Sequence, residues 1–201
     1  MEELQLNEGR GLVVVAHPDD ETIWMGGTIL KFPNVRWTIF SLCRSSDADR
    51  APKFKRVCEY YGARAMILDL EDEGMMTIDE SLPEIEKRIL GELEGEQFDY
   101  IFTHGSNGEY GHPRHRGVHY ALKRIVEGQQ VRFKQLFFFA YLLDSQKYMR
   151  NDLGGANTFL SLTQEELLRK KNIIASFYDF PKTSFEMKSC LEREMFALRK
   201  S

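Results

Sequence analysis

Residues 12–21 read LVVVAHPDDE, an apolar run followed at once by an imidazole and three carboxylates. A continuous apolar run of this kind is typical of a strand buried on both faces of a parallel sheet. The polar residues then lie at the carboxyl end of that strand, where open α/β sheets form their ligand crevice. The stretch therefore predicts both a fold class and the place of a functional site.

Short β-branched runs alternate with longer amphipathic segments along the chain. This alternation predicts βαβ units, and so a three-layer αβα domain of Rossmann-like type with a mainly parallel sheet. The 201 residues fit a single domain over 1–201. The sequences SLPE at residue 81 and TQEE at residue 163 are typical of capping boxes. We expect strands at 12–16, 35–42, 65–70, 100–103, 135–140 and 158–162, and helices at 22–32, 51–61, 81–94, 114–126, 163–175 and 185–198.

A second polar cluster, GEYGHPRH at residues 108–115, also follows an apolar strand-like run. His17 and Asp20 are spaced i, i+3, so on a first helical turn they can share one ion. His112 and His115 have the same spacing, and either completes a set of two histidines and one aspartate. Three protein ligands plus one open position are typical of catalytic zinc.

The remaining residues of the two clusters favour hydrolysis of an amide. Zinc lowers the pKa of a bound water to about 7, and Asp19 is placed to take its proton. Tyr110 is a hydrogen-bond donor for the oxyanion that develops on the carbonyl. The histidine that is not a ligand can protonate the leaving amine, and we favour His112 for this role.

Together the two stretches resemble the PIG-L/LmbE-like family of zinc-dependent N-deacetylases, from about residue 11 to about residue 144. The resemblance implies that the chain removes an N-acetyl group from a small molecule that contains an amino sugar. It also implies a role for each polar residue: zinc ligands His17, Asp20 and His115, general base Asp19, oxyanion donor Tyr110, and proton donor His112.

The chain departs from the family pattern in two places. The family usually has Asp between the two histidines of the second stretch, where this chain has Arg114. The loop after the second strand, usually rich in glycine and acidic, reads CRSSD at residues 43–47. Arg44 in that loop and Asp72 after the third strand face the same crevice, so each is a candidate contact for a hydroxyl-rich or anionic substrate, with a solvated surface position as the alternative.

Composition limits the partners and the compartment. A formal net charge of −4 gives no argument for nucleic-acid binding. The basic runs at 53–56 and 169–171 predict solvated helix faces. Three scattered cysteines without a CxxC pair favour a reducing cytoplasm, and no apolar run approaches the roughly 18 residues of a membrane span. A homo-oligomer is compatible with the sequence.

Two other functions use the same residues. The site could bind a metal or a sugar without catalysis, and recruitment of His119, the reserve ligand, as a fourth donor would indicate such a closed site. The HxD…H pattern of His17 with a distant histidine also occurs in non-haem iron oxygenases. That reading leaves the second aspartate without a task. A role for His104 at the end of the fourth strand is left open.

Overall fold

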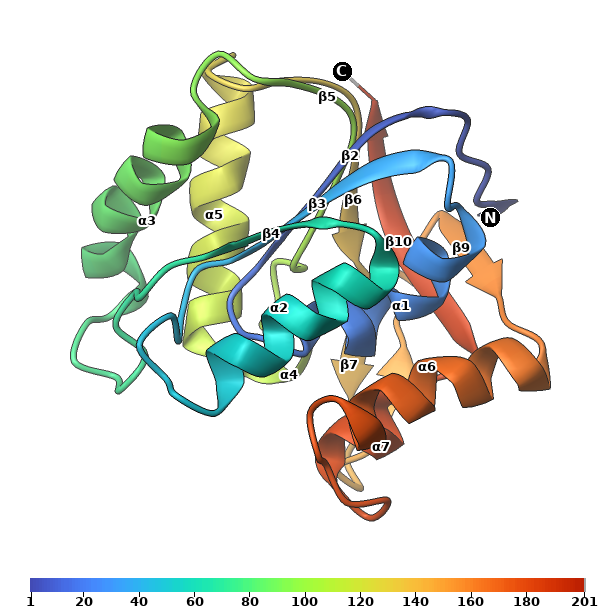
Figure 1. The fold of residues 1–201 in the computed structure, drawn as a ribbon. Coiled ribbons are helices and arrows are strands. Elements are labelled where there is room, and N and C mark those ends of the chain that lie inside the picture. Colours follow the sequence, from blue (N-terminus) through green and yellow to red (C-terminus); the bar gives the residue numbers. More distant parts are fainter. Residues whose placement is uncertain (201) are drawn as a thin grey trace.

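Eight strands form one sheet in the computed structural model, which describes residues 1–200 (Figure 1). Their order is β1-β9-β10-β6-β5-β2-β3-β4. The five strands from β6 to β4 run parallel, and β10 lies antiparallel between β6 and β9. A separate hairpin pairs β7 with β8. The strands are β1 Glu2–Glu3, β2 Gly9–Val15, β3 Val35–Ser41, β4 Arg64–Ile67, β5 Gln97–Thr103, β6 Arg132–Phe139, β7 Tyr141–Leu143, β8 Met149–Asn151, β9 Thr158–Ser161 and β10 Arg193–Lys200.

Helices cover both faces of the sheet, so the predicted three-layer fold with a mainly parallel sheet is confirmed. Helices α3 and α5 lie on one face, and α1, α2 and α6 lie on the other (Figure 1). Each face has its own apolar core. The helices are α1 Asp20–Lys31, α2 Arg50–Tyr61, α3 Ile78–Leu93, α4 Gly108–Gly111, α5 Pro113–Glu127, α6 Gln164–Ser176 and α7 Phe185–Ser189.

The central position of β2 in the sheet explains why its residues 12–15 are all apolar. Val13 and Val15 point into the core beneath α1, α2 and α6. Leu12 and Val14 point into the core beneath α3 and α5. All four side chains are fully buried, as expected for a central parallel strand.

The predicted helix at 185–198 is wrong beyond its first residues. The structure has a helix of only five residues, α7, and then strand β10. Met195 and Phe196 are fully buried where β10 inserts between β6 and β9. The segment contains several good helix formers, but its place in the sheet overrides that weak preference.

One of the two predicted capping boxes is misplaced. Helix α3 begins before residue 81, because Thr77 is its N-cap and forms a capping box with Glu80. Pro83 therefore lies inside the helix, and the Ser81 hydroxyl donates to the Ile78 carbonyl instead of capping. The capping box between Thr163 and Glu166 at the start of α6 is confirmed.

A buried ion pair joins α1 to the C-terminal part of the chain. Helix α1 is interrupted at Met25, whose φ of −148° is not helical. The carboxylate of Glu194 on β10 caps the restarted helix by accepting the backbone N–H groups of Gly27 (2.8 Å) and Thr28 (2.7 Å). Lys170 of α6 donates to the same carboxylate at 2.7 Å and is 1 % exposed. The prediction of a solvated face at 169–171 is thus wrong for Lys170.

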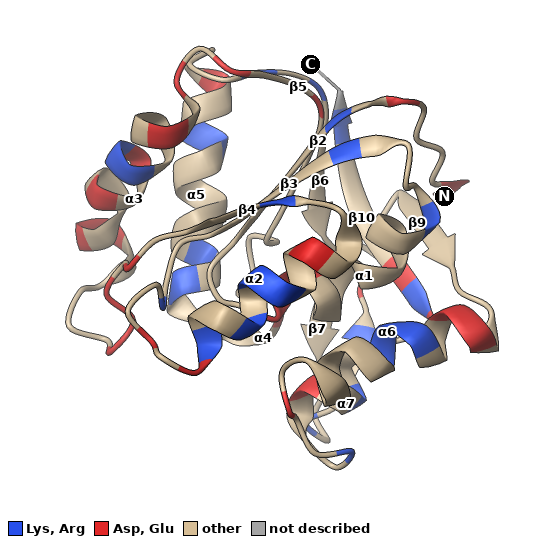
Figure 2. Ribbon diagram, viewed as in Figure 1, with Lys and Arg blue, Asp and Glu red and all other residues tan. Residues whose placement is uncertain are grey.

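On α2 and α3 the charged side chains are exposed or half-buried. Figure 2 shows acidic and basic residues mixed along α2, α3 and α6. Of the basic run on α2, Lys55 and Arg56 are exposed, while the apolar Phe54 within it points into the core.

Candidate metal centre and active site

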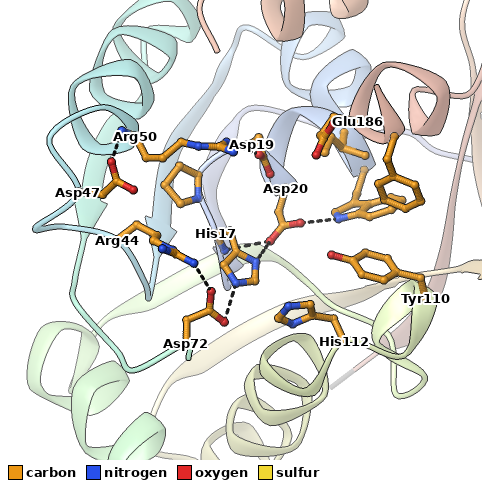
Figure 3. Close-up of a pocket in the computed structure, with 14 residues that line it drawn as sticks. His17, Asp19, Asp20, Arg44, Asp47, Arg50, Asp72, Tyr110, His112 and Glu186 are labelled. Atoms are coloured by element: carbon orange, nitrogen blue, oxygen red, sulfur yellow. Dashed lines mark hydrogen bonds and ion pairs between the residues drawn. The ribbon is translucent and has the colours of Figure 1, made fainter. Parts of the chain in front are cut away.

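A polar cavity of about 360 Å³ opens at the carboxyl ends of the parallel strands. Its side chains come from the segments that follow β2, β3, β4 and β5, as the sequence predicts, including the starts of α1 and α2 and helix α4, and also from α7 (Figure 3). The cavity is lined by His17, Pro18, Asp19, Asp20, Ile23, Trp24, Arg44, Asp47, Arg50, Asp72, Tyr110, His112, Phe185 and Glu186.

The turn between β2 and α1 has a strained backbone. Asp19, the N-cap of α1, has a φ of 110°, a left-handed value that residues other than glycine rarely adopt. Its N–H donates to the carboxylate of Glu21 (3.0 Å), which is fully buried and also accepts the hydroxyl of Tyr178 (2.9 Å). These buried contacts hold a conformation that would otherwise relax, as is common at functional sites.

The side chains of the three predicted ligands converge. His17 Nδ1 lies 3.3 Å from Asp20 Oδ2 and 3.2 Å from His115 Nε2, and the last two atoms are 3.4 Å apart. Ligands at ~2.0–2.2 Å from a tetrahedral metal ion are ~3.3–3.6 Å from one another. The observed separations match this triangle, so the two histidines and one aspartate fit a zinc ion or a similar divalent metal.

A carboxylate stands behind His17. Asp72 Oδ1 is 3.1 Å from His17 Nε2, within ion-pair distance, although neither atom completes a hydrogen bond of standard geometry with the described residues. Asp72 Oδ2 accepts from Arg44 at 2.9 Å. Burial opposes ionisation of Asp72, but His17 and Arg44 outweigh it and lower the pKa of that carboxyl to about 2. Asp72 is therefore an anion that can accept the proton on the far side of the His17 ring.

A second carboxylate stands behind His115. Glu109 Oε2 lies 2.6 Å from His115 Nδ1 and 2.8 Å from His104 Nδ1. Since an ionised carboxylate only accepts, both rings hold their proton on Nδ1. His115 Nε2 is then free to bind a metal, and His104 Nε2 accepts the backbone N–H of Ala16 (3.0 Å). Burial opposes the charge on Glu109, yet the two histidines lower the pKa of its carboxyl to about 2. His104 thus supports the site from behind.

Asp19 is paired with Arg50, the first residue of α2. Its Oδ2 is 2.7 Å from Arg50 Nη1, and the guanidinium lies 4.6 Å from the ring centre of Phe180. Burial and the neighbouring Asp20 charge raise the pKa of Asp19 well above its usual range, while Arg50 acts to lower it. Arg50 was missed in the sequence, although it begins a helix shortly after the end of the second strand, where the crevice was expected.

Tyr110 and His112 lie across the cavity from Asp19 and Arg50 (Figure 3). Burial, reinforced by the charges of Asp20 and Asp19, raises the pKa of Tyr110, so its hydroxyl stays protonated. His112 Nδ1 accepts the backbone N–H of Arg114 (3.2 Å), which leaves Nε2 as the nitrogen that carries the ring proton. Burial and the neighbouring histidines lower the pKa of His112 to about 4. Both residues are therefore neutral hydrogen-bond donors at pH 7.

Some polar residues do not join the cavity. His119 Nδ1 donates to the carbonyl of His104 (2.9 Å), so its ring holds the backbone behind the site. Cys43, Cys58 and Cys190 are all buried, and Cys43 lies beside His17 and Asp72.

Helix α7 contributes two residues that the sequence reasoning missed. Phe185 packs edge-on against Tyr110, with 5.1 Å between the ring centres. Figure 3 shows Glu186 across the cavity from Arg44. Among the described residues, none forms a hydrogen bond or an ion pair with the Glu186 carboxylate. Both residues were missed because the sequence was interpreted as one long helix over 185–198, whereas α7 is short and its first residues line the cavity.

The model of the PIG-L family, described as GlcNAc-PI de-N-acetylase, matches residues 12–126. This match covers more than half of the chain. The chain belongs to the PIG-L family. The matched segment contains every predicted catalytic and metal-binding residue, whereas α7 lies outside it. Membership supports a hydrolase that acts on an amide of a sugar-like substrate.

Solved structures share the fold at low sequence identity. The A40926 pseudoaglycone deacetylase has 12 % identity and a TM-score of 0.68, over 96 % of this chain and 98 % of that one. A deacetylase in complex with teicoplanin has 10 % identity and a TM-score of 0.62, over 96 % and 99 %. The hydratase GalB of Pseudomonas putida KT2440, which acts on 4-carboxy-2-hydroxymuconate, has 16 % identity and a TM-score of 0.60, over 94 % and 95 %. The fold thus serves different reactions, and the site must decide between them.

No helix among residues 1–200 combines the length and the apolar character that a membrane crossing requires.

Proposed function

We propose that this PIG-L family member is a metal-dependent N-deacetylase that releases acetate from an N-acetylated amino sugar. The observation that carries the proposal is the triangle formed by His17 Nδ1, Asp20 Oδ2 and His115 Nε2, with edges of 3.2–3.4 Å. These residues would hold zinc or a similar ion. When bound, the ion would acidify a water molecule and polarise the amide carbonyl.

Asp19 is the proposed general base. Its carboxylate lines the cavity beside Asp20 and is oriented by Arg50. It takes a proton from the water that attacks the amide carbon, and the water oxygen forms the new C–O bond. A carboxylate shielded from solvent in this way contributes ~10²–10⁴-fold to such a step.

Tyr110 and His112 act on the other side of the amide. The neutral hydroxyl of Tyr110 donates to the oxygen on which negative charge develops. Because the ring of His112 is neutral at pH 7, we revise its expected role: it does not supply the proton to the leaving amine but hydrogen-bonds to the leaving nitrogen through Nε2–H. The C–N bond then breaks, and the proton gained by Asp19 passes to the amine. The immediate products are acetic acid and the amine, and transfer of the acid's remaining proton to the amine gives acetate and ammonium, so atoms and charge balance.

We propose that the part of the substrate beyond the acetamide lies between Arg44 and α7. Arg44 and Asp72 bind each other across the loops, and the outer face of this pair remains part of the cavity wall. Phe185 offers a ring and Glu186 an unpaired carboxylate on the opposite wall. A hydroxyl-rich sugar fits this combination of hydrogen-bonding groups and an aromatic surface.

A role in binding without catalysis is the alternative. A closed structural site needs four protein ligands, but His119 is bonded elsewhere and Nδ1 of His112 is occupied by Arg114 N–H. A binding site also has no need of a base such as Asp19 beside the ligands. An iron oxygenase is disfavoured by family membership.

Acetate release from a panel of N-acetylglucosamine derivatives tests the proposal. The zinc-loaded protein is compared with Asp19→Asn, and with Asp49→Asn as a matched control at an exposed aspartate. We expect release from at least one compound, a loss of ~100-fold or more in Asp19→Asn, and no change in the control. Zinc binding without release from any compound would favour the binding role.

A further inference from the structure

Arg114, the residue that departs from the family pattern, is buried and does not face the cavity. It is 2 % exposed, and its Nη2 donates to Glu71 Oε2 (2.7 Å) and to the carbonyl of Met76 (2.9 Å). Only its backbone N–H serves His112. The guanidinium therefore ties α5 to the loop between β4 and α3.

The two partners of Arg114 stand on either side of Asp72 in the sequence. Glu71 precedes Asp72 directly, and its other carboxylate oxygen accepts the backbone N–H of Met75 (3.0 Å). The loop is thus closed on itself by Glu71 and anchored to α5 by Arg114. In this arrangement the side chain of Asp72 is 8 % exposed and is directed at His17.

His17 needs a partner on the far side of its ring. When Nδ1 of an imidazole binds a metal, the ring proton must stay on Nε2, and an acceptor there sets the orientation of the ring. Asp72 Oδ1 is the acceptor within reach, at 3.1 Å. A shift of the loop by about an ångström would remove this support.

We propose that Arg114 is a positioning residue for the metal centre, acting through the loop at 71–76 and the carboxylate of Asp72 on the ring of His17. The inference rests on the proposed function, because it presumes that His17 binds a metal. The inference also explains what Arg114 does where the family usually has Asp. Its side chain fixes the loop that carries Asp72, the partner of His17, while His112 is held by a backbone N–H.

Affinity for Co²⁺ tests the inference without using catalysis. Co²⁺ is titrated into the full-length wild type, Arg114→Lys, Asp72→Asn and the double variant, with the visible spectrum reporting coordination. Loss of a carboxylate behind a metal-binding histidine weakens binding by ~10–100-fold. We expect such a loss for Asp72→Asn and a loss of about 3–10-fold for the more remote Arg114→Lys. In the Asp72→Asn background, Arg114→Lys should change the affinity by less than about twofold, because both changes act through one contact.

Two further variants keep the result interpretable if Arg114→Lys folds poorly. Glu71→Gln removes the same ion pair at a side chain that is 19 % exposed, and it should reproduce the loss. Arg88→Ala removes an arginine paired with Glu84 within α3 and should leave Co²⁺ affinity unchanged. Wild-type affinity in both Arg114→Lys and Glu71→Gln would overturn the inference, as would an equal loss with and without Asp72. A wild type that binds no Co²⁺ would instead overturn the metal centre, and this inference with it.

Discussion

Asp19 and Arg50 form an ion pair of 2.7 Å between the start of α1 and the start of α2. The pair joins the two loops that follow neighbouring strands β2 and β3. It gives the proposed base a fixed direction and a positive charge that favours its ionised form.

Removal of Arg50 is therefore expected to impair the base. Arg50 lowers the pKa of Asp19 against the effect of burial, so in Arg50→Ala that pKa should rise. Because the base works only when deprotonated, the acidic limb of the pH profile of kcat/KM should move to higher pH. We expect kcat at pH 7 to fall by ~10–100-fold, less than the loss of the base itself. Arg50→Lys should recover part of the loss, and an unmoved acidic limb would contradict the role.

Replacement of Glu109 is expected to weaken metal binding. Its carboxylate orients His115 from behind, at 2.6 Å. In Glu109→Gln an amide replaces the charged acceptor shared by two histidines, so we expect zinc affinity to fall by ~10–100-fold. Competition with a chromophoric chelator measures it. Glu127→Gln, at an exposed surface ion pair with Arg199, is the control. Equal affinities of Glu109→Gln and wild type would refute the role of Glu109.

The ion pair of Lys170 with Glu194 should matter for stability. Both side chains are almost fully buried, and removing one partner leaves an unpaired buried charge, which costs ~3–5 kcal/mol. Lys170→Met should therefore lower the free energy of unfolding by about this amount in urea denaturation. Arg124→Ala, which breaks an exposed pair with Glu86, should cost less than about 1 kcal/mol. Similar losses in the two variants would show that the buried pair has no special weight.

Replacement of Glu186 is expected to weaken substrate binding without slowing the chemical step. Its carboxylate lines the cavity but is neither a proposed metal ligand nor the proposed base. Glu186→Gln should raise KM for an extended substrate by about tenfold, the value of a hydrogen bond to a charged group, and leave kcat unchanged. N-acetylglucosamine itself, which lacks the extension, should show a smaller effect. A fall in kcat with constant KM would place Glu186 in the chemistry instead.

The sequence predicts those features that depend on local pattern. The apolar run of β2 and the alternation of strands and helices suffice for the layered fold, since both faces of the strand are buried. The rule that crevices form at strand ends then brings His17 and Asp20 close to the second histidine cluster, while the choice of His115 over His112 as ligand rests on the family resemblance.

Features that depend on contacts between distant segments could not be predicted. Lys170 lies in a basic run that looks solvated, and only the position of β10 shows that Glu194 faces it. The same is true of Arg50, which becomes part of the site through its contact with Asp19. The residues of α7 were missed because one helix was predicted over 185–198, with no functional residue assigned to it, whereas the second half of this segment forms strand β10.

Metal removal and return is the most direct test of the central claim that His17, Asp20 and His115 hold a catalytic ion. The protein is stripped with a chelator, and deacetylation of the best substrate is followed while zinc is added back. We predict that activity disappears on stripping and returns in proportion to zinc up to one ion per chain, while Asp20→Asn regains little at the same zinc concentration. Full activity in the stripped protein, or full recovery in Asp20→Asn, would contradict the account.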